Sequence, residues 1–289
     1  MPVRVPNGTR EGVLMSLYPA ESNLARLTVS DFSKSQQQPW PVLTAYDSWT
    51  AKIFDDAGIP MLLVGDSAAM VMLGQSNTLA ITPEEMIPMI RAVVRATTRA
   101  FVVADLPFGS YQENPDQALA TSLQIVKQTG AHAVKLEGGT RMQEQIRHIV
   151  ESGIPVVGHV GLTPQSVNAL GGYKVQGRGD AAEQVMRDAI AVEEAGAFAL
   201  VVEVVPLELG KRITELLTIP VIGIGAGNQT DAQVLVWQDL FGASNETSAK
   251  FVKPYLDLYE LMKSGVERWA HDVQQRIYPD EFHSYRDKK

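Results

Sequence analysis

The sequence of 289 residues contains no cysteine. This absence excludes disulfides, thiolate metal sites and a cysteine nucleophile. No apolar run approaches the roughly 18 residues that a membrane helix needs. Lysine and arginine number 25 against 33 aspartates and glutamates, which gives a net charge of −8, and no segment is densely basic. A nucleic-acid or membrane partner is therefore not expected, and we expect a cytoplasmic protein with small-molecule substrates.

A short apolar run that ends in a charged or polar side chain recurs along the sequence. These endings are Asp66, Asp105, Glu137, His159 and Glu203. Continuous apolar runs of this length are typical of strands buried on both faces of a parallel sheet. The carboxyl ends of such strands form the active-site mouth of α/β barrels. We therefore expect these five residues to meet in one site.

Helix signals separate the apolar runs. Thr82, Pro83 and Glu85 form a capping-box helix start, and Thr140 with Gln143 is predicted to form another. Glycines that end helices lie immediately before several strands. About eight such units predict a (β/α)8 TIM barrel with parallel strands ending near residues 45, 64, 105, 136, 159, 203 and 224 and a weaker one at 233–236. An open, doubly wound sheet is the alternative.

The two ends of the sequence differ from this pattern. Residues 1–25 are interpreted as an N-terminal extension, either a mobile arm or a packing extension, with a targeting peptide as the alternative. Residues 26–289 are interpreted as a single catalytic barrel domain with C-terminal helices from about residue 250. Two amphipathic helices are predicted there, at 250–265 and 266–276. We expect them to close the barrel or to pack on a second subunit.

Asp66 and Asp105 should be neighbours at the barrel mouth, where two carboxylates suit a hard cation such as Mg²⁺. The alternative is that each caps a helix. Lys135 and Glu137 lie two residues apart on one strand and so point the same way. They form either a structural ion pair or a site in which Lys135 binds an anionic substrate and Glu137 contacts the metal, directly or through water.

Two further side chains are candidates for chemistry. His159 is either a hydrogen-bonded core residue or part of the site, since the glycines on both sides allow close approach of a ligand. Glu203 lies among valines, and apolar surroundings raise the pKa of a carboxyl group towards the range useful for a general base. The glycine cluster at 223–227 suits phosphate binding or tight packing. The loop at 171–179 is either a mobile lid or a solvent loop.

Several long motifs of the sequence resemble those of ketopantoate hydroxymethyltransferases (3-methyl-2-oxobutanoate hydroxymethyltransferases). They are LTAYD at 43–47, VGDS at 64–67, VVADLPF at 102–108, AVKLEGG at 133–139, GHVGLTPQ at 158–165, GIGAG at 223–227, FVK at 251–253 and PDEFHSY at 279–285. The resemblance covers residues 26–285.

The resemblance implies a (β/α)8 barrel that transfers a one-carbon unit from 5,10-methylenetetrahydrofolate to 3-methyl-2-oxobutanoate. The product, 2-dehydropantoate, leads to pantothenate. It also implies one Mg²⁺ per subunit and a homo-oligomer, often a decamer. Residue roles that it implies are Mg²⁺ binding by Asp66, Asp105 and Glu137, keto-acid contact by Ser67 and Lys135, and proton removal by Glu203. His159 lies in a motif next to the substrate.

The sequence departs from the family pattern in two places. Residues 228–232 read NQTDA where the family has a cysteine-aspartate-glycine step, and Trp237-Gln238-Asp239 replaces a histidine-aspartate pair. The folate side of the site or the subunit packing is therefore expected to differ. Three other functions are open: a class I aldolase with Lys135 as Schiff-base nucleophile, an Mg²⁺-dependent lyase of the isocitrate lyase or phosphoenolpyruvate mutase type, and a non-enzymatic barrel.

Overall fold

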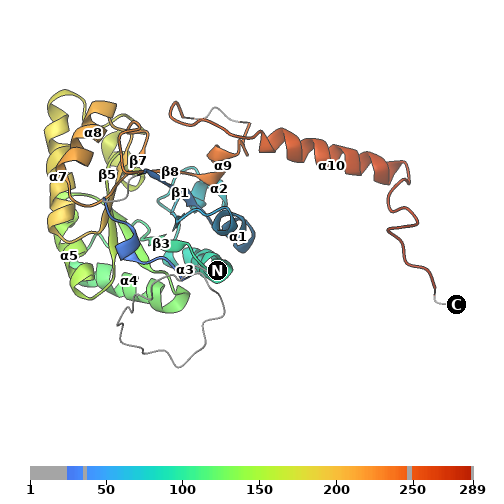
Figure 1. Cartoon of the computed structure of the whole chain (residues 1–289), viewed down its shortest axis with the longest axis horizontal. Coiled ribbons are helices and arrows are strands. Elements are labelled where there is room, and N and C mark those ends of the chain that lie inside the picture. Colours follow the sequence, from blue (N-terminus) through green and yellow to red (C-terminus); the bar gives the residue numbers. More distant parts are fainter. Residues whose placement is uncertain (1–24, 35–37, 246–248, 288–289) are drawn as a thin grey trace, which may run out of the picture.

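Eight parallel strands form a closed barrel in sequence order, as the sequence predicts (Figure 1). The computed structural model describes residues 25–34, 38–245 and 249–287. Each strand pairs with its sequence neighbours, and β1 pairs with β8. The strands are β1 (Trp40–Thr44), β2 (Met61–Val64), β3 (Phe101–Asp105), β4 (Ala133–Glu137), β5 (Val156–Gly161), β6 (Ala199–Glu203), β7 (Val221–Ile224) and β8 (Ala232–Leu235). The alternative of an open sheet is wrong.

Helices surround the barrel. The α-helices are α1 (Ser48–Asp56), α2 (Ala68–Val71), α3 (Pro83–Ala96), α4 (Pro115–Thr129), α5 (Gln143–Glu151), α6 (Val167–Leu170), α7 (Ala182–Glu194), α8 (Leu207–Leu216), α9 (Trp237–Leu240) and α10 (Leu258–Gln274). Short 3₁₀ turns are η1 (Val29–Asp31), η2 (Thr140–Met142), η3 (Pro164–Ser166) and η4 (Gly179–Ala181). Contacts between the outer helices run from α1 through α3, α4, α5 and α7 to α8.

One predicted helix start is confirmed and one is wrong. Thr82 caps α3, because its hydroxyl accepts from the Glu85 amide while the Glu85 carboxylate accepts from the Thr82 amide. Thr140 does not cap α5, which begins after the turn η2. Its hydroxyl and amide instead donate to Asp188 of α7, at 2.8 and 2.9 Å. Thr140 thus binds Asp188, 48 residues away in the sequence, and not the backbone of its own helix near Gln143, as the sequence suggested.

The apolar core has two layers. One lies inside the barrel and ends in an aromatic plug at the amino ends of the strands, where Phe32 contacts Trp40 and Phe101. The other lies between the strands and the helices. Gly158 of β5 permits a close approach there, because a Cβ at this position would lie 2.3 Å from Cγ1 of Val192 in α7.

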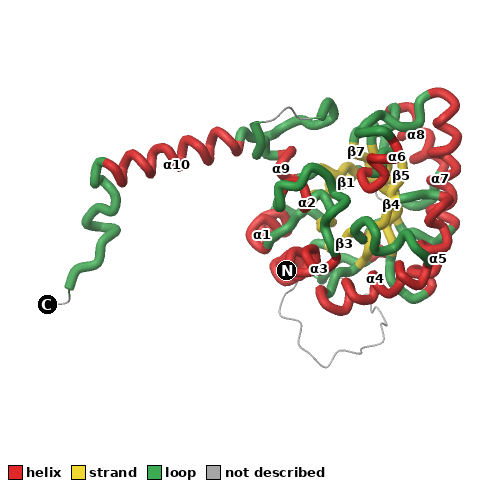
Figure 2. The backbone as a smooth tube through the Cα atoms, turned by 180° about the vertical axis from the view of Figure 1, so that it is seen from behind, coloured by secondary structure: helices red, strands yellow, loops and turns green. Residues whose placement is uncertain are grey.

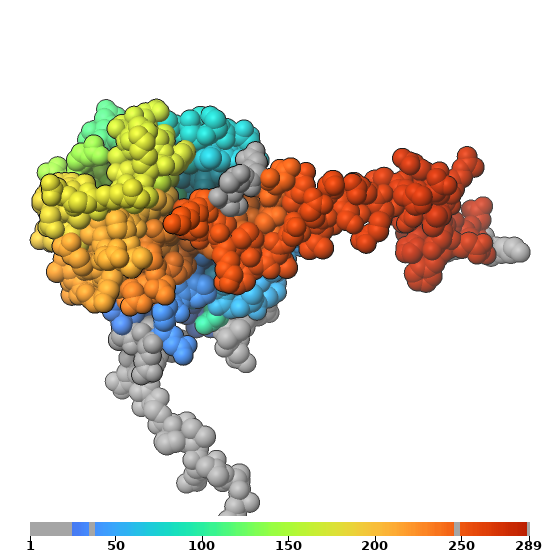
Figure 3. Space-filling view, turned by 90° about the horizontal axis from the view of Figure 1, so that it is seen from above, coloured from blue at the N-terminus to red at the C-terminus, as the bar shows by residue number. Residues whose placement is uncertain are grey.

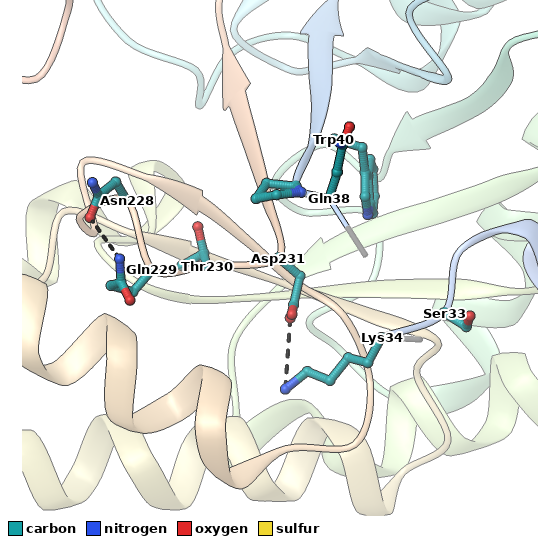
Figure 4. A pocket seen from close by; sticks show the side chains of 9 residues that line it. Ser33, Lys34, Gln38, Trp40, Asn228, Gln229, Thr230 and Asp231 are labelled. Carbon is teal, nitrogen blue, oxygen red and sulfur yellow. Dashed lines mark hydrogen bonds and ion pairs between the residues drawn. The ribbon is translucent and has the colours of Figure 1, made fainter. Parts of the chain in front are cut away.

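A cavity of about 260 Å³ lies at the amino ends of β1 and β8 (Figure 4). Lys34 points to Asp231 across it, with 3.7 Å between Nζ and Oδ2. The same ammonium donates to the backbone oxygens of Thr214 and Leu217 at the end of α8. Lys34 therefore ties the entering chain to the bottom of the barrel, opposite the mouth where catalytic groups collect in this fold.

The C-terminal part forms one helix, not the two that the sequence predicts. α10 continues through Gly265 and projects away from the barrel in every view (Figures 1, 2 and 3). None of its residues is buried. The prediction that this part closes the barrel of its own chain is therefore wrong. The extension predicted at residues 1–25 lies outside the described residues, except for residue 25.

In the part of the chain that the structure describes, the outer ring of helices is open between α8 and α1. Only residues 225–231 connect β7 to β8, and the helix that follows β8, α9, has four residues. On the two helices that flank this opening, Trp49 and Ile53 of α1 and Leu216 of α8 are exposed. Among the described residues, no helix is both long and apolar enough to span a membrane.

Asp55 joins α1 to the start of β3. Its buried carboxylate accepts from the amides of Thr98, Arg99 and Ala100 and from the Thr98 hydroxyl. Burial alone would raise the pKa of Asp55, but these donors outweigh it and the pKa is lowered. The charge is thus held by backbone hydrogen bonds that fix the path into the strand.

We expect Asp55→Ala to lower the free energy of unfolding by about 2–4 kcal/mol, because it leaves several buried amides without acceptors. Urea denaturation followed by circular dichroism measures the change. Asp56→Ala is the matched control, since Asp56 makes only an exposed pair with Lys52 and should change stability by less than about 0.5 kcal/mol. Equal effects of the two substitutions would contradict this account of Asp55.

Candidate active site

A cavity of about 1020 Å³ opens at the carboxyl ends of the strands. It is lined by all seven residues that the sequence predicts for the site: Asp66, Ser67, Asp105, Lys135, Glu137, His159 and Glu203. They come from five consecutive strands, β2 to β6, or from the residues just after them. The shared strand ends account for this grouping, because the barrel places every carboxyl end on one face.

Lys135 and Asp105 form a buried ion pair inside the cavity. Nζ of Lys135 lies 2.6 Å from Oδ1 of Asp105, and the two side chains are 5% and 3% exposed. Burial alone would lower the pKa of Lys135, but Asp105, Glu137 and Asp66 outweigh it and the pKa is raised. The protonated form of Lys135 is therefore favoured inside the site.

Asp66 lies against Asp105 at the end of β2. The Asp66 amide donates to Oδ2 of Asp105 over 3.1 Å. Burial, together with the charges of Asp105 and Glu137, raises the pKa of Asp66 to about 8. The carboxylates around Asp66 thus carry more negative charge than Lys135 compensates.

Gln165 connects these acidic residues, and the sequence analysis assigned it no role. The side-chain Nε2 of Gln165 donates to Oδ2 of Asp66 at 2.8 Å, and its backbone N–H donates to Oε2 of Glu137 at 2.9 Å. Its Oε1 accepts from the hydroxyl of Tyr111 at 2.6 Å. Gln165 belongs to the GHVGLTPQ motif, but its contact with Asp66 spans 99 residues of sequence, so only the folded barrel reveals it.

His159 lies between two carboxylates. Its Nδ1 is 3.5 Å from Oε1 of Glu137, and its Nε2 is 3.2 Å from Oε2 of Glu203. Burial and Lys135 alone would lower the pKa of His159, but the two carboxylates outweigh them and raise it to about 9. Glu203 is therefore not surrounded only by apolar groups, as the sequence suggested, because a protonated imidazole faces it.

The backbone just after Glu203 is strained. Val204 has φ of 48°, in the left-handed region, which is a genuine outlier for a β-branched residue and costs on the order of 1–3 kcal/mol. Its amide donates to the Ile224 carbonyl and its carbonyl accepts from the Gln176 amide. Such strain is typical of functional sites, and here it lies directly after Glu203.

Two neighbouring segments complete the cavity wall. Ser67 shares a hydrogen bond of 2.8 Å with the hydroxyl of Tyr46. Tyr173, in the glycine-rich loop 171–179, also lines the cavity and is 52% exposed. This loop therefore borders the site, although its motion stays a prediction.

The glycine cluster at 223–227 has a packing role. A Cβ at Gly223 would lie 2.6 Å from Oγ1 of Thr230, and one at Gly225 would lie 2.9 Å from the Phe251 ring. These short distances leave no room for larger side chains, so tight packing accounts for the glycines and no bound phosphate is needed to explain them.

The predicted metal ligands do not form a preformed three-residue cluster. Among the described residues, no group of three or more histidines, cysteines, aspartates or glutamates has the spacing of a metal site. Lys135 occupies one oxygen of Asp105, while Gln165 and His159 contact Glu137. The donor chemistry nevertheless fits Mg²⁺, which proteins commonly hold by one or two carboxylates with water or substrate oxygens completing the shell.

Comparison with known proteins gives one consistent result at the sequence level. The model of the family described as ketopantoate hydroxymethyltransferase matches residues 26–281. A 3-methyl-2-oxobutanoate hydroxymethyltransferase of Mycobacterium sp. (strain KMS) is 58% identical over 252 residues, covering 87% of this chain and 89% of that protein. The enzyme of the same name from Thermobifida fusca (strain YX) is 55% identical over 273 residues, covering 93% and 97%.

Solved structures show the same barrel at much lower identity. The trigonal crystal structure of 2,3-dimethylmalate lyase, a PEP mutase/isocitrate lyase superfamily member, has a TM-score of 0.59 at 14% identity, covering 85% of this chain and 83% of the other. Phosphonopyruvate hydrolase has a TM-score of 0.57 at 13% identity, covering 86% and 87%. These similarities support the fold alone.

We expect the metal-free protein to lose stability as pH rises from about 4 to about 8 because of Asp66. The folded state keeps the Asp66 proton up to a pKa of about 8, whereas the unfolded chain releases it near its ordinary value of 3.8. Folding therefore becomes less favourable as pH rises through this window.

Urea unfolding in EDTA at pH 5 and pH 8 measures this loss. Asp66→Asn, which cannot titrate, should reduce the loss by more than about 2 kcal/mol. Asp180→Asn, at an exposed residue, is the control and should leave the loss as in wild type. A loss of the same size in wild type and Asp66→Asn would contradict the assignment.

Proposed function

The chain belongs to the ketopantoate hydroxymethyltransferase family of enzymes, and we propose that it transfers a one-carbon unit from 5,10-methylenetetrahydrofolate to 3-methyl-2-oxobutanoate, giving 2-dehydropantoate. The proposed sequence is removal of the C3 proton followed by attack of the resulting enolate on the one-carbon unit. The observation that carries this proposal is the cavity in which one buried lysine lies among four carboxylates and a protonated histidine.

Asp66 and Asp105 are the residues proposed to hold Mg²⁺, with Glu137 contacting it through water. The raised pKa of Asp66 supports this assignment, because it reflects negative charge that a divalent cation would offset. Glu137 is the less direct ligand, since Gln165 and His159 already contact its two oxygens. When bound, Mg²⁺ supplies positive charge beside the 2-oxo group, where negative charge develops as C3 loses its proton.

Lys135 and Ser67 are proposed to bind the oxo acid. The ammonium of Lys135 is protonated and lines the cavity, so it can attract the substrate carboxylate. Its pairing with Asp105 at 2.6 Å supports this charged role over that of a Schiff-base nucleophile, which needs a neutral amine. The Ser67 hydroxyl lies at the end of β2, oriented by its hydrogen bond to Tyr46.

Glu203 is proposed to accept the C3 proton. The C3–H bond breaks, its electron pair delocalises towards the 2-oxo oxygen, and the proton moves to the carboxylate. Two features support this role: the side chain lines the cavity, and protonated His159 lies 3.2 Å from its carboxylate.

The enolate carbon would then form a bond to the methylene carbon of the folate, and the carbon–nitrogen bonds that hold this carbon would break. In the overall balance one water supplies the product hydroxyl, and tetrahydrofolate leaves. The rival lyase function has less support, because such lyases commonly use a catalytic cysteine and this chain has none.

We expect the protein with Mg²⁺ to exchange the C3 hydrogen of 3-methyl-2-oxobutanoate with D₂O in the absence of folate. Proton NMR follows the exchange. Glu203→Gln should slow it by about 10²–10⁴-fold, the usual contribution of a general base, and EDTA should also suppress it. Glu208→Gln, in an exposed part of α8, is the matched control and should exchange at the wild-type rate.

Turnover assays that add methylenetetrahydrofolate and detect 2-dehydropantoate test the transfer itself. Exchange at an equal rate in wild type and Glu203→Gln would remove Glu203 from the role of base. Exchange without any product in the complete mixture would show that the one-carbon donor is wrong.

We also propose that the chain is a homo-oligomer, by family resemblance a decamer. The projecting helix α10, referred to below as the arm, supports this proposal. It presents an exposed apolar stripe formed by Leu261, Met262, Val266 and Trp269. Trp49 and Ile53 of α1 and Leu216 of α8, on the helices that flank the opening in the ring, are exposed apolar side chains as well. Stripes of this type are uncommon on soluble helices without a partner.

Mass photometry should give a particle close to ten times the 31.5 kDa of one chain. Val266→Asp places a charge in the apolar stripe and should shift the population to smaller particles. Ser264→Asp adds the same charge on another face of α10 and should leave the mass unchanged. A wild-type mass of 31.5 kDa would contradict the proposal.

A further inference from the structure

Four polar residues line the same large cavity but take no part in the proton removal described above. They are Gln75 and Thr78, in the loop after α2, and Gln238 and Asp239, in α9. Their loops follow β2 and β8, which are both neighbours of β1. The four residues therefore occupy the sector β8–β1–β2, next to Asp66 and Ser67 and away from Glu203 on β6.

These residues have oxygen atoms without partners. Within the part of the chain that the structure describes, Oε1 of Gln75, Oγ1 of Thr78 and Oε1 of Gln238 are buried and make no hydrogen bond. Thr78 is only 2% exposed. The carboxylate of the half-buried Asp239 likewise has no hydrogen bond or ion pair to a described residue, and burial raises its pKa.

Nearby side chains do not compensate for this. Among the described residues, the Nε2 of Gln238 contacts only the Met72 sulfur, over a weak 3.4 Å. Each unpaired buried polar atom costs about 1–3 kcal/mol, and native proteins retain few of them. Several in one wall of a ligand cavity therefore indicate groups that a ligand completes.

The chemistry of the unpaired atoms restricts that ligand. The unpaired atoms are all acceptor oxygens, and among them only the Thr78 hydroxyl can also donate. A matching ligand must therefore present several N–H or O–H donors along one edge. Met70, Val71 and Phe251 line the same cavity and provide apolar contacts for the faces of a flat ring.

A reduced 2-amino-4-oxopteridine has this combination of features. One edge carries an amino group and ring N–H groups, and the ring faces are apolar. At about 1020 Å³ the cavity is also far larger than a five-carbon oxo acid needs, since drug-sized ligands occupy about 300–1,000 Å³.

We propose that Gln75, Thr78, Gln238 and Asp239 bind the N–H edge of the pteridine ring of the one-carbon donor. This inference rests on the proposed function and adds the residues that recognise the second substrate. Because the β8–β1–β2 sector adjoins Asp66 and Ser67, a ring bound there lies beside the oxo-acid site. The one-carbon unit that it carries is then within reach of C3.

Steady-state kinetics of Asp239→Asn and Gln238→Leu test the assignment. Each substitution keeps the approximate size of the side chain and removes an acceptor. We expect the KM for methylenetetrahydrofolate to rise at least tenfold, while the KM for 3-methyl-2-oxobutanoate changes less than twofold. Asp180→Asn, an exposed substitution outside the cavity, is the control and should change neither constant.

Two fragments of the donor locate the contact. 6-Methyltetrahydropterin, which is the ring without the tail, should inhibit wild type competitively against the folate and should inhibit Asp239→Asn at least tenfold more weakly. p-Aminobenzoylglutamate, the tail without the ring, should inhibit both equally. Circular dichroism of each variant confirms folding, and Gln238→Leu provides the test if Asp239→Asn does not fold.

The outcomes separate this inference from the function on which it rests. Normal turnover with a folate KM within twofold of wild type in both variants would overturn the inference and leave the function intact. A pterin that inhibits both proteins equally would do the same. Wild-type protein that exchanges C3 hydrogen but never consumes methylenetetrahydrofolate would overturn the donor, and this inference with it.

Discussion

The buried pair of Lys135 and Asp105 is the interaction on which the active-site geometry depends. Two charges removed from water cost several kcal/mol each unless close opposite charges and hydrogen bonds compensate them. Here the pair is 2.6 Å long and almost fully buried, and Asp66, Glu137 and His159 surround it. Such a cluster is stable only if its members stay in place, which the closed ring of strands ensures.

Gln165 extends that constraint to the loops. By contacting Asp66, Glu137 and Tyr111, it connects the ends of β2 and β4 with the loop after β3. The geometry of the acidic residues therefore depends on the side chain of Gln165, a neutral amide that does not ionise. The arrangement of the cavity wall thus rests on a neutral connecting residue as well as on the charged ones.

The fold and the membership of the site could be predicted from the sequence, because both depend on local patterns. Apolar runs with glycine joints specify βα units, and a closed barrel necessarily gathers the residues at their carboxyl ends. Contacts across long stretches of sequence could not be predicted. Thr140 binds Asp188 rather than capping its own helix, Gln165 reaches Asp66, and His159 changes the surroundings of Glu203. Similarly, the amphipathic pattern after residue 250 predicted a helix, but it did not predict that this helix, α10, would project away from the barrel.

The opening in the helix ring has a thermodynamic consequence. A monomeric barrel covers its strands with its own helices, so its stability is independent of concentration. In this chain α10 leaves the barrel, and exposed apolar side chains remain on both the arm and the barrel wall. If copies of the chain cover these surfaces for one another, part of the folding free energy belongs to association, and dilution shifts the equilibrium towards unfolding. The melting temperature then depends on the protein concentration, and it rises as that concentration increases.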